Sequence, residues 1–407
     1  MTDPCQKTCS DLTLSYGQQK SAIRELFEYG KMKAKEIGAD KVFDFSIGNP
    51  SVPPPQEVEE AFHSLLQEKD PIALHGYTSA AGDPVVRQQI AEQLNTEYGT
   101  HYDASQLYLT CGAAAALSST FRALSLESED NEFIVAAPYF PEYKCFVEGH
   151  GGKLSVVPST LPALDLPLQA IENAITTSTR AVIINSPNNP SGKLYETAEL
   201  QSLAALLEKK AKDIGHPIYI VSDEPYRELV YDDQKAPFIP LIYPNTLVCY
   251  SYSKALSMPG ERIGYVLVPP EADYSKDLYD AIAGAARSLG YVCAPSLIQR
   301  VVGLCAHVKP DIRAYDENRH LLYEGLTHIG YEAIYPNGAF YLFVKAPGND
   351  AKAFSDYAKQ HCNLLLVPSE SFGFPGFLRI SYCVSKERIE SAMPLFEHCF
   401  KTYQSRT

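Results

Sequence analysis

Short apolar runs rich in β-branched residues alternate with longer stretches of helical periodicity between about residues 105 and 268. Runs that are apolar along their whole length are typical of strands covered on both faces. Strands that alternate with helices along a chain indicate a mainly parallel sheet with helices on both sides. The sequence therefore predicts an α/β fold with a doubly wound, mainly parallel sheet. The predicted strands are 107–110, 132–137, 154–158, 180–185, 218–222, 247–250 and 265–268.

The 407 residues exceed what one small core needs and suit one large domain plus a smaller one. We expect residues 1–48 to form an N-terminal arm and helix that join the small domain. Residues 49–295 are expected to form the large domain, and residues 296–407 a small α+β domain. Polar residues 1–17 predict a loose arm at the start of the chain. The predicted helices are 18–38, 84–98, 196–213, 272–289 and 295–328.

The composition argues against several classes of partner. Hydrophobic residues make up 45% of the chain, which is enough for a substantial core, and the formal net charge is −14. This charge argues against nucleic acid and anionic membrane surfaces as partners. No apolar run approaches the roughly 20 residues of a membrane span. Ten cysteines without a CxxC pair, behind a polar N-terminus with no secretory signal, predict reduced thiols in a cytoplasmic protein without a metal site.

The most informative motif is the segment 251–264, which follows the predicted strand 247–250. Lys254 stands there among apolar and hydroxyl-bearing neighbours, where burial would lower the pKa of its ammonium and make it a candidate Schiff-base former. Arg262 follows between two glycines, and arginine can bind two phosphate oxygens at once. The plainer alternative is a solvated turn flanked by two cations.

Other polar residues occur where predicted strands end or inside an apolar strand. Asp223 follows a buried strand, where a carboxylate is costly unless it is paired. Gly112 opens a helix after a strand, which leaves backbone N–H groups free for an anion. Arg379 lies in an alternating apolar strand and needs an anion, which a structural carboxylate could also supply. Asn189 lies in a run of turn-forming residues and could belong to an ordinary turn.

Taken in order, these motifs resemble the class-I/II pyridoxal-phosphate-dependent aminotransferases, the aspartate aminotransferase-like enzymes of fold type I. The resemblance spans nearly the whole chain. It implies pyridoxal 5'-phosphate as cofactor, bound to Lys254 as an aldimine. The implied catalytic residues are Lys254, Asp223 and Tyr226. Asp223 would pair with the ring nitrogen, and Tyr226 and Asn189 with the phenolic oxygen.

The resemblance also implies the remaining contacts of the cofactor and substrate. Phe140 would stack on the pyridine ring. The substrate would meet Gly48, Asn189 and Arg379, with Arg379 binding its α-carboxylate. The aromatic residues of the segment 336–343 would lie close to the substrate. The phosphate would be held by Gly112, Ala113, Ser251, Ser253, Arg262 and Tyr77.

The implied assembly is a homodimer in which Tyr77 reaches the neighbouring active site. The spacing of Tyr77 and Gly82 in a glycine-bounded loop carries that resemblance. Substrate specificity could involve Arg287 or the segment 288–295, although a charged helix residue usually faces water.

The resulting hypothesis is a ping-pong transfer of an amino group from an L-amino acid to a 2-oxo acid, with 2-oxoglutarate as the family's usual acceptor. Three alternatives remain open at this point. The same site could catalyse β- or γ-elimination or a synthase reaction. The chain could be a cofactor-binding regulator, or an unrelated α/β protein with coincident motifs.

Overall fold

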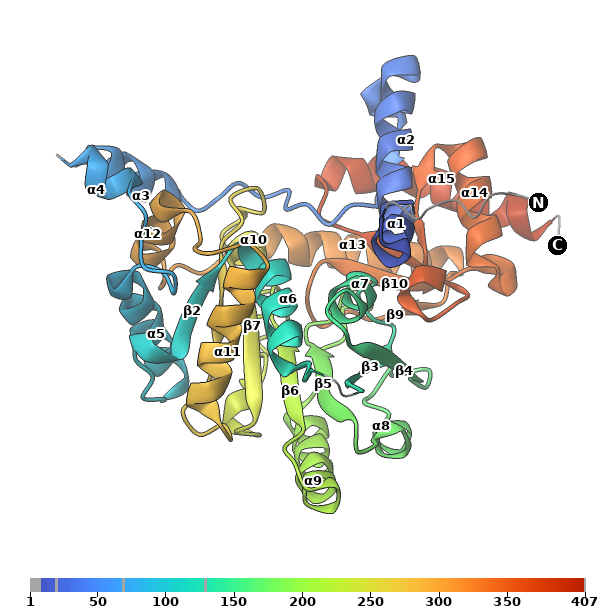
Figure 1. Cartoon of the computed structure of the whole chain (residues 1–407). Coiled ribbons are helices and arrows are strands. Elements are labelled where there is room, and N and C mark those ends of the chain that lie inside the picture. Colours follow the sequence, from blue (N-terminus) through green and yellow to red (C-terminus); the bar gives the residue numbers. More distant parts are fainter. Residues whose placement is uncertain (1–8, 19–20, 68–69, 128–129, 406–407) are drawn as a thin grey trace, which may run out of the picture.

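The computed structural model describes residues 9–18, 21–67, 70–127 and 130–405 (Figure 1). In this part of the chain, a large half is built on a sheet of seven strands, parallel except for β8, which runs antiparallel to both neighbours. In order across the sheet, the strands are β2 (Leu107–Thr110), β8 (Gly264–Leu267), β7 (Thr246–Ser251), β6 (Tyr219–Asp223), β5 (Thr179–Asn185), β3 (Glu132–Ala137) and β4 (Lys153–Pro158).

Helices cover both faces of this sheet because successive side chains of a strand point to opposite faces. Phe133 and Val135 of β3 pack toward one set of helices, and Ile134 and Ala136 pack toward the other. The first set is α6 (Gly112–Leu124), α7 (Glu142–Glu148) and α11 (Ser275–Ser288); the second is α8 (Leu168–Ala174) and α9 (Thr197–Ile214). The predicted doubly wound α/β fold is confirmed.

A group of helices packs at the β2 edge of the sheet. Their apolar side chains share a core cluster with β2, β7 and β8. The group comprises α3 (Gln56–Leu66), α5 (Pro84–Tyr98) and α12 (Ser296–Leu304), with α4 (Pro71–His75) beside α12.

The smaller half has an antiparallel sheet of its own and a core that combines α13, α14 and α15. Its strands, in sheet order, are β12 (Val367–Pro368), β13 (Phe377–Ser381), β10 (Tyr341–Lys345) and β9 (Ala333–Ile334). Its helices are α13 (Arg313–Ile329), α14 (Ala351–Cys362) and α15 (Lys386–Gln404).

The segment before the large half belongs with this smaller core. β1 (Phe43–Asp44) pairs in parallel with β11 (Leu364–Leu365). Leu26 of α2 (Ala22–Ile37) packs with Val367 and Phe372. The division into residues 1–48, 49–295 and 296–407 stays a prediction.

Two sequence predictions differ from the structure. The single helix expected over 295–328 is divided into α12 and α13, because Pro310 has no backbone N–H to donate and disfavours helix in the residue before it. The loose arm expected over 1–17 contains a helix, α1 (Asp11–Gln18), in its described portion; residues 1–8 lie outside the described residues.

Among the described residues, no helix is both long enough and apolar enough to cross a lipid bilayer.

The close approach of β8 to its neighbours requires a glycine. A Cβ atom at Gly264 would lie 2.2 Å from the carbonyl oxygen of Tyr250 and 3.2 Å from Gly112 Cα. We therefore expect Gly264→Ala to lower the free energy of unfolding by about 2 kcal/mol, as in other overpacked interiors. Gly284→Ala on α11 is the matched control, since nothing lies within 4 Å of the added atom and alanine favours helix by about 1 kcal/mol. Thermal unfolding of the cofactor-free proteins measures both changes. Equal melting temperatures for Gly264→Ala and wild type would contradict the packing argument.

Candidate active site

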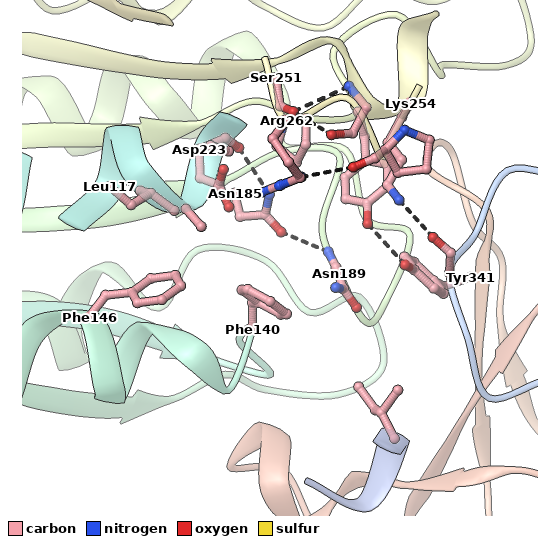
Figure 2. A pocket seen from close by; sticks show the side chains of 18 of the residues that line it. Leu117, Phe140, Phe146, Asn185, Asn189, Asp223, Ser251, Lys254, Arg262 and Tyr341 are labelled. Carbon is pink, nitrogen blue, oxygen red and sulfur yellow. Dashed lines mark hydrogen bonds between the residues drawn. The ribbon is translucent and has the colours of Figure 1, made fainter. Parts of the chain in front are cut away.

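A cavity of about 290 Å³ lies where the carboxyl ends of the parallel strands face the smaller half (Figure 2). Open α/β sheets place ligands at this edge. The large half supplies strand-end and helix-start residues, among them Asn185, Asp223 and Ser251. Tyr341 of β10 and Arg379 of β13 complete the wall.

The structure brings most of the predicted site residues together around this cavity. Those that line it are Gly48, Ala113, Phe140, Asn189, Asp223, Tyr226, Ser251, Ser253, Lys254, Arg262 and Arg379. Gly112 lies directly behind Arg262, within van der Waals reach of its guanidinium. Tyr77 is not part of this wall: its side chain is 99% exposed on the loop after α4. Arg287, near the end of α11, is also exposed.

Lys254 lies on α10 (Tyr252–Ala255), a single turn that follows β7. Its ammonium donates a hydrogen bond to the carbonyl oxygen of Gly48 at 2.7 Å. Burial lowers the pKa of Lys254 to about 8, and the nearby Arg262 and Arg379 charges act in the same direction, whereas Cys383 opposes them. At pH 7 about a tenth of this amine is therefore neutral, and hence nucleophilic, compared with less than a thousandth for a lysine with the ordinary pKa of about 10.4.

One end of the cavity is suited to a phosphate. Ser251 Oγ and Ser253 Oγ are 2.7 Å apart, and Arg262 donates to the carbonyl oxygen of Pro259 at 3.1 Å. α6 begins here, since Ala113 and Ala114 of its first turn line the cavity, and the free N–H groups of a helix start suit an anion. Gly112 has φ +79°, and a Cβ atom on it would lie 2.9 Å from Arg262 Nη2. Glycine thus allows the guanidinium to approach the start of the helix.

Asp223 is deeply buried at the end of β6. Its Oδ2 accepts a hydrogen bond from Tyr143 at 2.5 Å, and its Oδ1 has no hydrogen-bond partner among the described residues. Burial raises the pKa of the Asp223 carboxyl to about 7, the Tyr143 hydrogen bond opposes this rise, and the Glu224 charge adds to it. A buried carboxylate with one free oxygen can accept a proton-bearing cationic ligand.

Hydrogen bonds connect the polar residues in the centre of the cavity. Asn189 N–H donates to Asn185 Oδ1 at 2.8 Å, and Asn185 Nδ2 donates to the Asp223 carbonyl at 2.9 Å (Figure 2). The hydroxyls of Tyr226 and Tyr341 are 2.9 Å apart. These contacts fix the side chains that face the cavity before any ligand arrives.

Arg379 is 2% exposed and has no carboxylate within ion-pair distance among the described residues. Its Nη1 donates to Asn189 Oδ1 at 3.1 Å and its Nη2 to the Ser46 carbonyl, while its Nε has no partner in the described part of the chain. The guanidinium lies over the Tyr341 ring, 4.6 Å from the centroid. A buried guanidinium held by neutral acceptors favours an anionic ligand.

Several lining residues were not predicted from the sequence. Leu117 and Phe146 lie on helices and carry no polar signal, and Ile23 reaches the cavity from α2, far away in the sequence. Asn185 is a polar residue at the end of a buried strand, as Asp223 is, so its place in the site could have been predicted from the sequence. Ala114, Pro225 and Pro259 also line the cavity and were not predicted as site residues.

Residues 40–394 match the family described as Aminotransferase class I and II, so the chain belongs to that family. An amino transferase from Eubacterium rectale is 54% identical, with a TM-score of 0.95 over 98% of this chain and 100% of that one. Aspartate aminotransferase from Thermus thermophilus, solved with maleate, is 26% identical, with a TM-score of 0.83 over 97% of this chain and 100% of that one. A probable aspartate/prephenate aminotransferase from Aquifex aeolicus is 31% identical over 377 residues, covering 88% of this chain and 91% of that protein.

The chain is therefore an aminotransferase, an enzyme that exchanges an amino group between an amino acid and a 2-oxo acid, with pyridoxal 5'-phosphate as its cofactor. The residues present fit that cofactor. The buried amine of Lys254 can lose its proton and react with an aldehyde. The helix N-terminus beside Arg262 suits a phosphate. The unpaired Oδ1 of Asp223 suits a protonated ring nitrogen. Family membership favours the aminotransferase hypothesis over elimination or synthase chemistry.

The lowered pKa of Lys254 predicts how fast the cofactor-free protein captures pyridoxal phosphate. Only the neutral amine attacks an aldehyde, so the rate should rise with pH and level off above about 8. An ordinary lysine, with a pKa of about 10.4, would still be gaining rate at pH values of about 10. Stopped-flow absorbance measures the rate, and dividing by the rate of Nα-acetyl-lysine in the same buffers removes the ionisation of the aldehyde itself. Because the reference amine goes on gaining rate up to about pH 10, the ratio should be constant below a pH of about 8 and fall above it. A ratio that is the same at every pH would contradict the burial argument.

Proposed function

We propose that Lys254 carries the cofactor and also moves the proton in the amino transfer. Its Nζ lies inside the cavity, among the strand ends of the large half, and hydrogen-bonds Gly48 on the segment that joins the two halves. The lowered pKa suits an amine that, once the substrate amine has displaced it from the cofactor, takes a proton from the substrate Cα and returns it to the C4′ carbon of the cofactor. When bound, the cofactor supplies an electron sink for the negative charge that this proton removal leaves.

The proposed roles of the other residues follow from their charge and position. Asp223 holds a proton on the ring nitrogen through its free Oδ1. Tyr226 and Asn189 serve the phenolic oxygen, and Phe140 covers the ring. Ser251, Ser253, Arg262, Gly112 and Ala113 hold the phosphate.

Arg379 is proposed to bind the substrate α-carboxylate, with Gly48 at its side. The single observation that carries this proposal is the buried guanidinium without an ion-pair partner in the described residues. Gly48 has to be a glycine there, since a Cβ atom would lie 1.9 Å from the Tyr341 hydroxyl. The cavity wall then presents Arg262 to the phosphate and Arg379 to the carboxylate.

We propose aspartate as an amino donor and 2-oxoglutarate as the acceptor. The support for aspartate is the naming of relatives as aspartate or aspartate/prephenate aminotransferases, and 2-oxoglutarate is the usual acceptor of the family that the sequence resembles. The lining residues Lys254, Arg262 and Arg379 outnumber the one lining carboxylate, Asp223, which suits anionic substrates.

Adding single amino acids without an acceptor to the cofactor-loaded enzyme tests this proposal. Aspartate should convert the near-visible absorbance band, and 2-oxoglutarate should restore it. Arg379→Lys should lower kcat/KM for aspartate by roughly 10- to 100-fold, mostly through KM, because one of two charge-assisted hydrogen bonds is lost. Arg313→Lys, an exposed arginine on α13, is the control and should behave as wild type. Release of ammonia without an acceptor would contradict amino transfer, and an unchanged KM in Arg379→Lys would contradict the carboxylate role.

We also propose a homodimer in which Tyr77 contacts the phosphate in the neighbouring active site. Tyr77 is 99% exposed, and apolar Ile72 and Val85 nearby in the chain are 83% and 64% exposed. A dimer interface over this segment would cover these exposed side chains. The cytoplasmic location stays a prediction.

The Tyr77 proposal predicts a loss of cofactor affinity without a loss of assembly. Tyr77→Phe removes one hydrogen bond to a charged group, so its dissociation constant for pyridoxal phosphate should rise about tenfold. Tyr274→Phe, 68% exposed before α11, should leave it unchanged. Sedimentation should give a dimer for all three proteins. A monomeric wild type, or unchanged affinity in Tyr77→Phe, would show the proposal to be wrong.

A further inference from the structure

Tyr143 lies beneath the active-site cavity, on α7, and is completely buried. Its ring does not line the cavity, but its hydroxyl contacts the one carboxylate that does. We propose that Tyr143 is a positioning residue that holds Asp223 with its Oδ1 toward the cofactor ring nitrogen and supports Phe140 on the cavity wall. The inference rests on the proposed pairing of Asp223 with that nitrogen.

The Tyr143 hydroxyl contacts only one of the two oxygens of the Asp223 carboxylate. Asp223 Oδ2 accepts the Tyr143 hydroxyl at 2.5 Å, whereas Oδ1 is buried and has no partner among the described residues. A buried carboxylate oxygen is costly to leave unpaired, so Oδ1 indicates a place for a ligand donor. Rotation of the carboxylate about its Cβ–Cγ bond would break the Tyr143 hydrogen bond. The tyrosine thus selects which oxygen is available to the cavity.

Tyr143 also contacts Phe140. The two rings meet edge to face, with centroids 5.6 Å apart and an interplanar angle of 85°. The Tyr143 N–H donates to the Phe140 carbonyl at 3.1 Å. Tyr143 therefore orients the Asp223 carboxylate through its hydroxyl and the Phe140 ring through its own ring and backbone. Both of these groups face the same cavity.

The Tyr143 hydroxyl also affects the protonation of Asp223. Donation by Tyr143 favours the ionised form of Asp223 and so lowers its pKa, against the larger effect of burial, which raises that pKa to about 7. Burial and the Asp223 charge raise the pKa of the Tyr143 hydroxyl far above its ordinary range, so the hydroxyl keeps its proton. Removing the hydroxyl should therefore shift Asp223 toward its protonated form at neutral pH.

The other charged and titratable groups around Asp223 come from several elements. Glu224 and Tyr226 follow it in the chain, and Cys249 lies on the neighbouring strand β7. Glu224 is itself bound by Arg227 at 3.0 Å, so it does not compete for the Tyr143 hydroxyl. The cations that share the cavity are Lys254, Arg262 and Arg379. Tyr143→Phe leaves every one of these groups in place.

Tyr143→Phe separates the hydroxyl from the ring, because the ring that packs on Phe140 remains. Tyr243→Phe is the matched control: Tyr243 is also buried, at 2% exposure, and donates to the Ile218 carbonyl at 2.6 Å, outside the cavity wall. Each variant is purified as the full chain and loaded with pyridoxal phosphate. The dissociation constant is measured by absorbance at a series of pH values, and the melting temperature of the cofactor-free form is measured in parallel.

We expect Tyr143→Phe to bind the cofactor about tenfold more weakly than wild type near neutral pH, since a hydrogen bond to a charged group is lost. The loss should shrink as the pH is raised, because Asp223 then ionises without the help of the hydroxyl. The pH at which binding is half-maximal should rise by about one unit, the shift that corresponds to a tenfold change. Tyr243→Phe should match wild type in affinity at every pH, whatever its melting temperature.

Two results would overturn the inference. Affinity equal to wild type at every pH would show that Tyr143 does not act on Asp223. A weakening that is the same at every pH would show that the tyrosine only supports the fold. Asp223→Asn distinguishes this failure from failure of the proposed function: if that variant keeps full affinity, the pairing of Asp223 with the ring nitrogen is wrong, and the present inference falls with it.

Discussion

The burial of the Lys254 amine is the constraint on which the rest of the site depends. A lysine surrounded by protein is more easily deprotonated than one in water, and here its pKa falls to about 8. The position is set by the single turn α10 after β7 and by the hydrogen bond to the Gly48 carbonyl. That hydrogen bond joins the end of the central sheet to the segment leading from the smaller half, so the amine is enclosed only when both halves are assembled.

The two halves contribute complementary chemistry to the cavity. The large half presents Asp223 and the phosphate-suited end around Arg262, all at the carboxyl ends of its strands and the start of α6. The smaller half presents Tyr341 and Arg379 from its own sheet. In the proposed function the large half holds the cofactor, and Arg379 of the smaller half binds the substrate carboxylate.

Much of this arrangement was predictable from the sequence because its signals are local. Apolar runs alternating with helices indicated the doubly wound sheet, and polar residues at strand ends, such as Asp223 and Lys254, had to meet at one edge of it. The helix break at Pro310 was also a local signal, but helical periodicity on both sides concealed it.

Other features depend on contacts between distant segments and left no local signal. Ile23 and Phe146 are apolar residues whose periodicity is equally consistent with an ordinary core, yet both reach the cavity. Tyr143 resembles a packing aromatic near two prolines until its hydroxyl is seen on Asp223. Tyr77 is exposed and does not line this cavity, so its predicted phosphate contact would lie in another subunit.

The most direct test of the account is to locate the bound cofactor chemically. The loaded protein is reduced with borohydride and digested, and the peptides are mapped by mass spectrometry. The account predicts one cofactor-labelled peptide per chain, carrying the label on Lys254, and none after reduction of Lys254→Ala. A label on another lysine, or an unlabelled Lys254 in a fully loaded protein, would contradict the central claim that the buried amine of Lys254 organises this site.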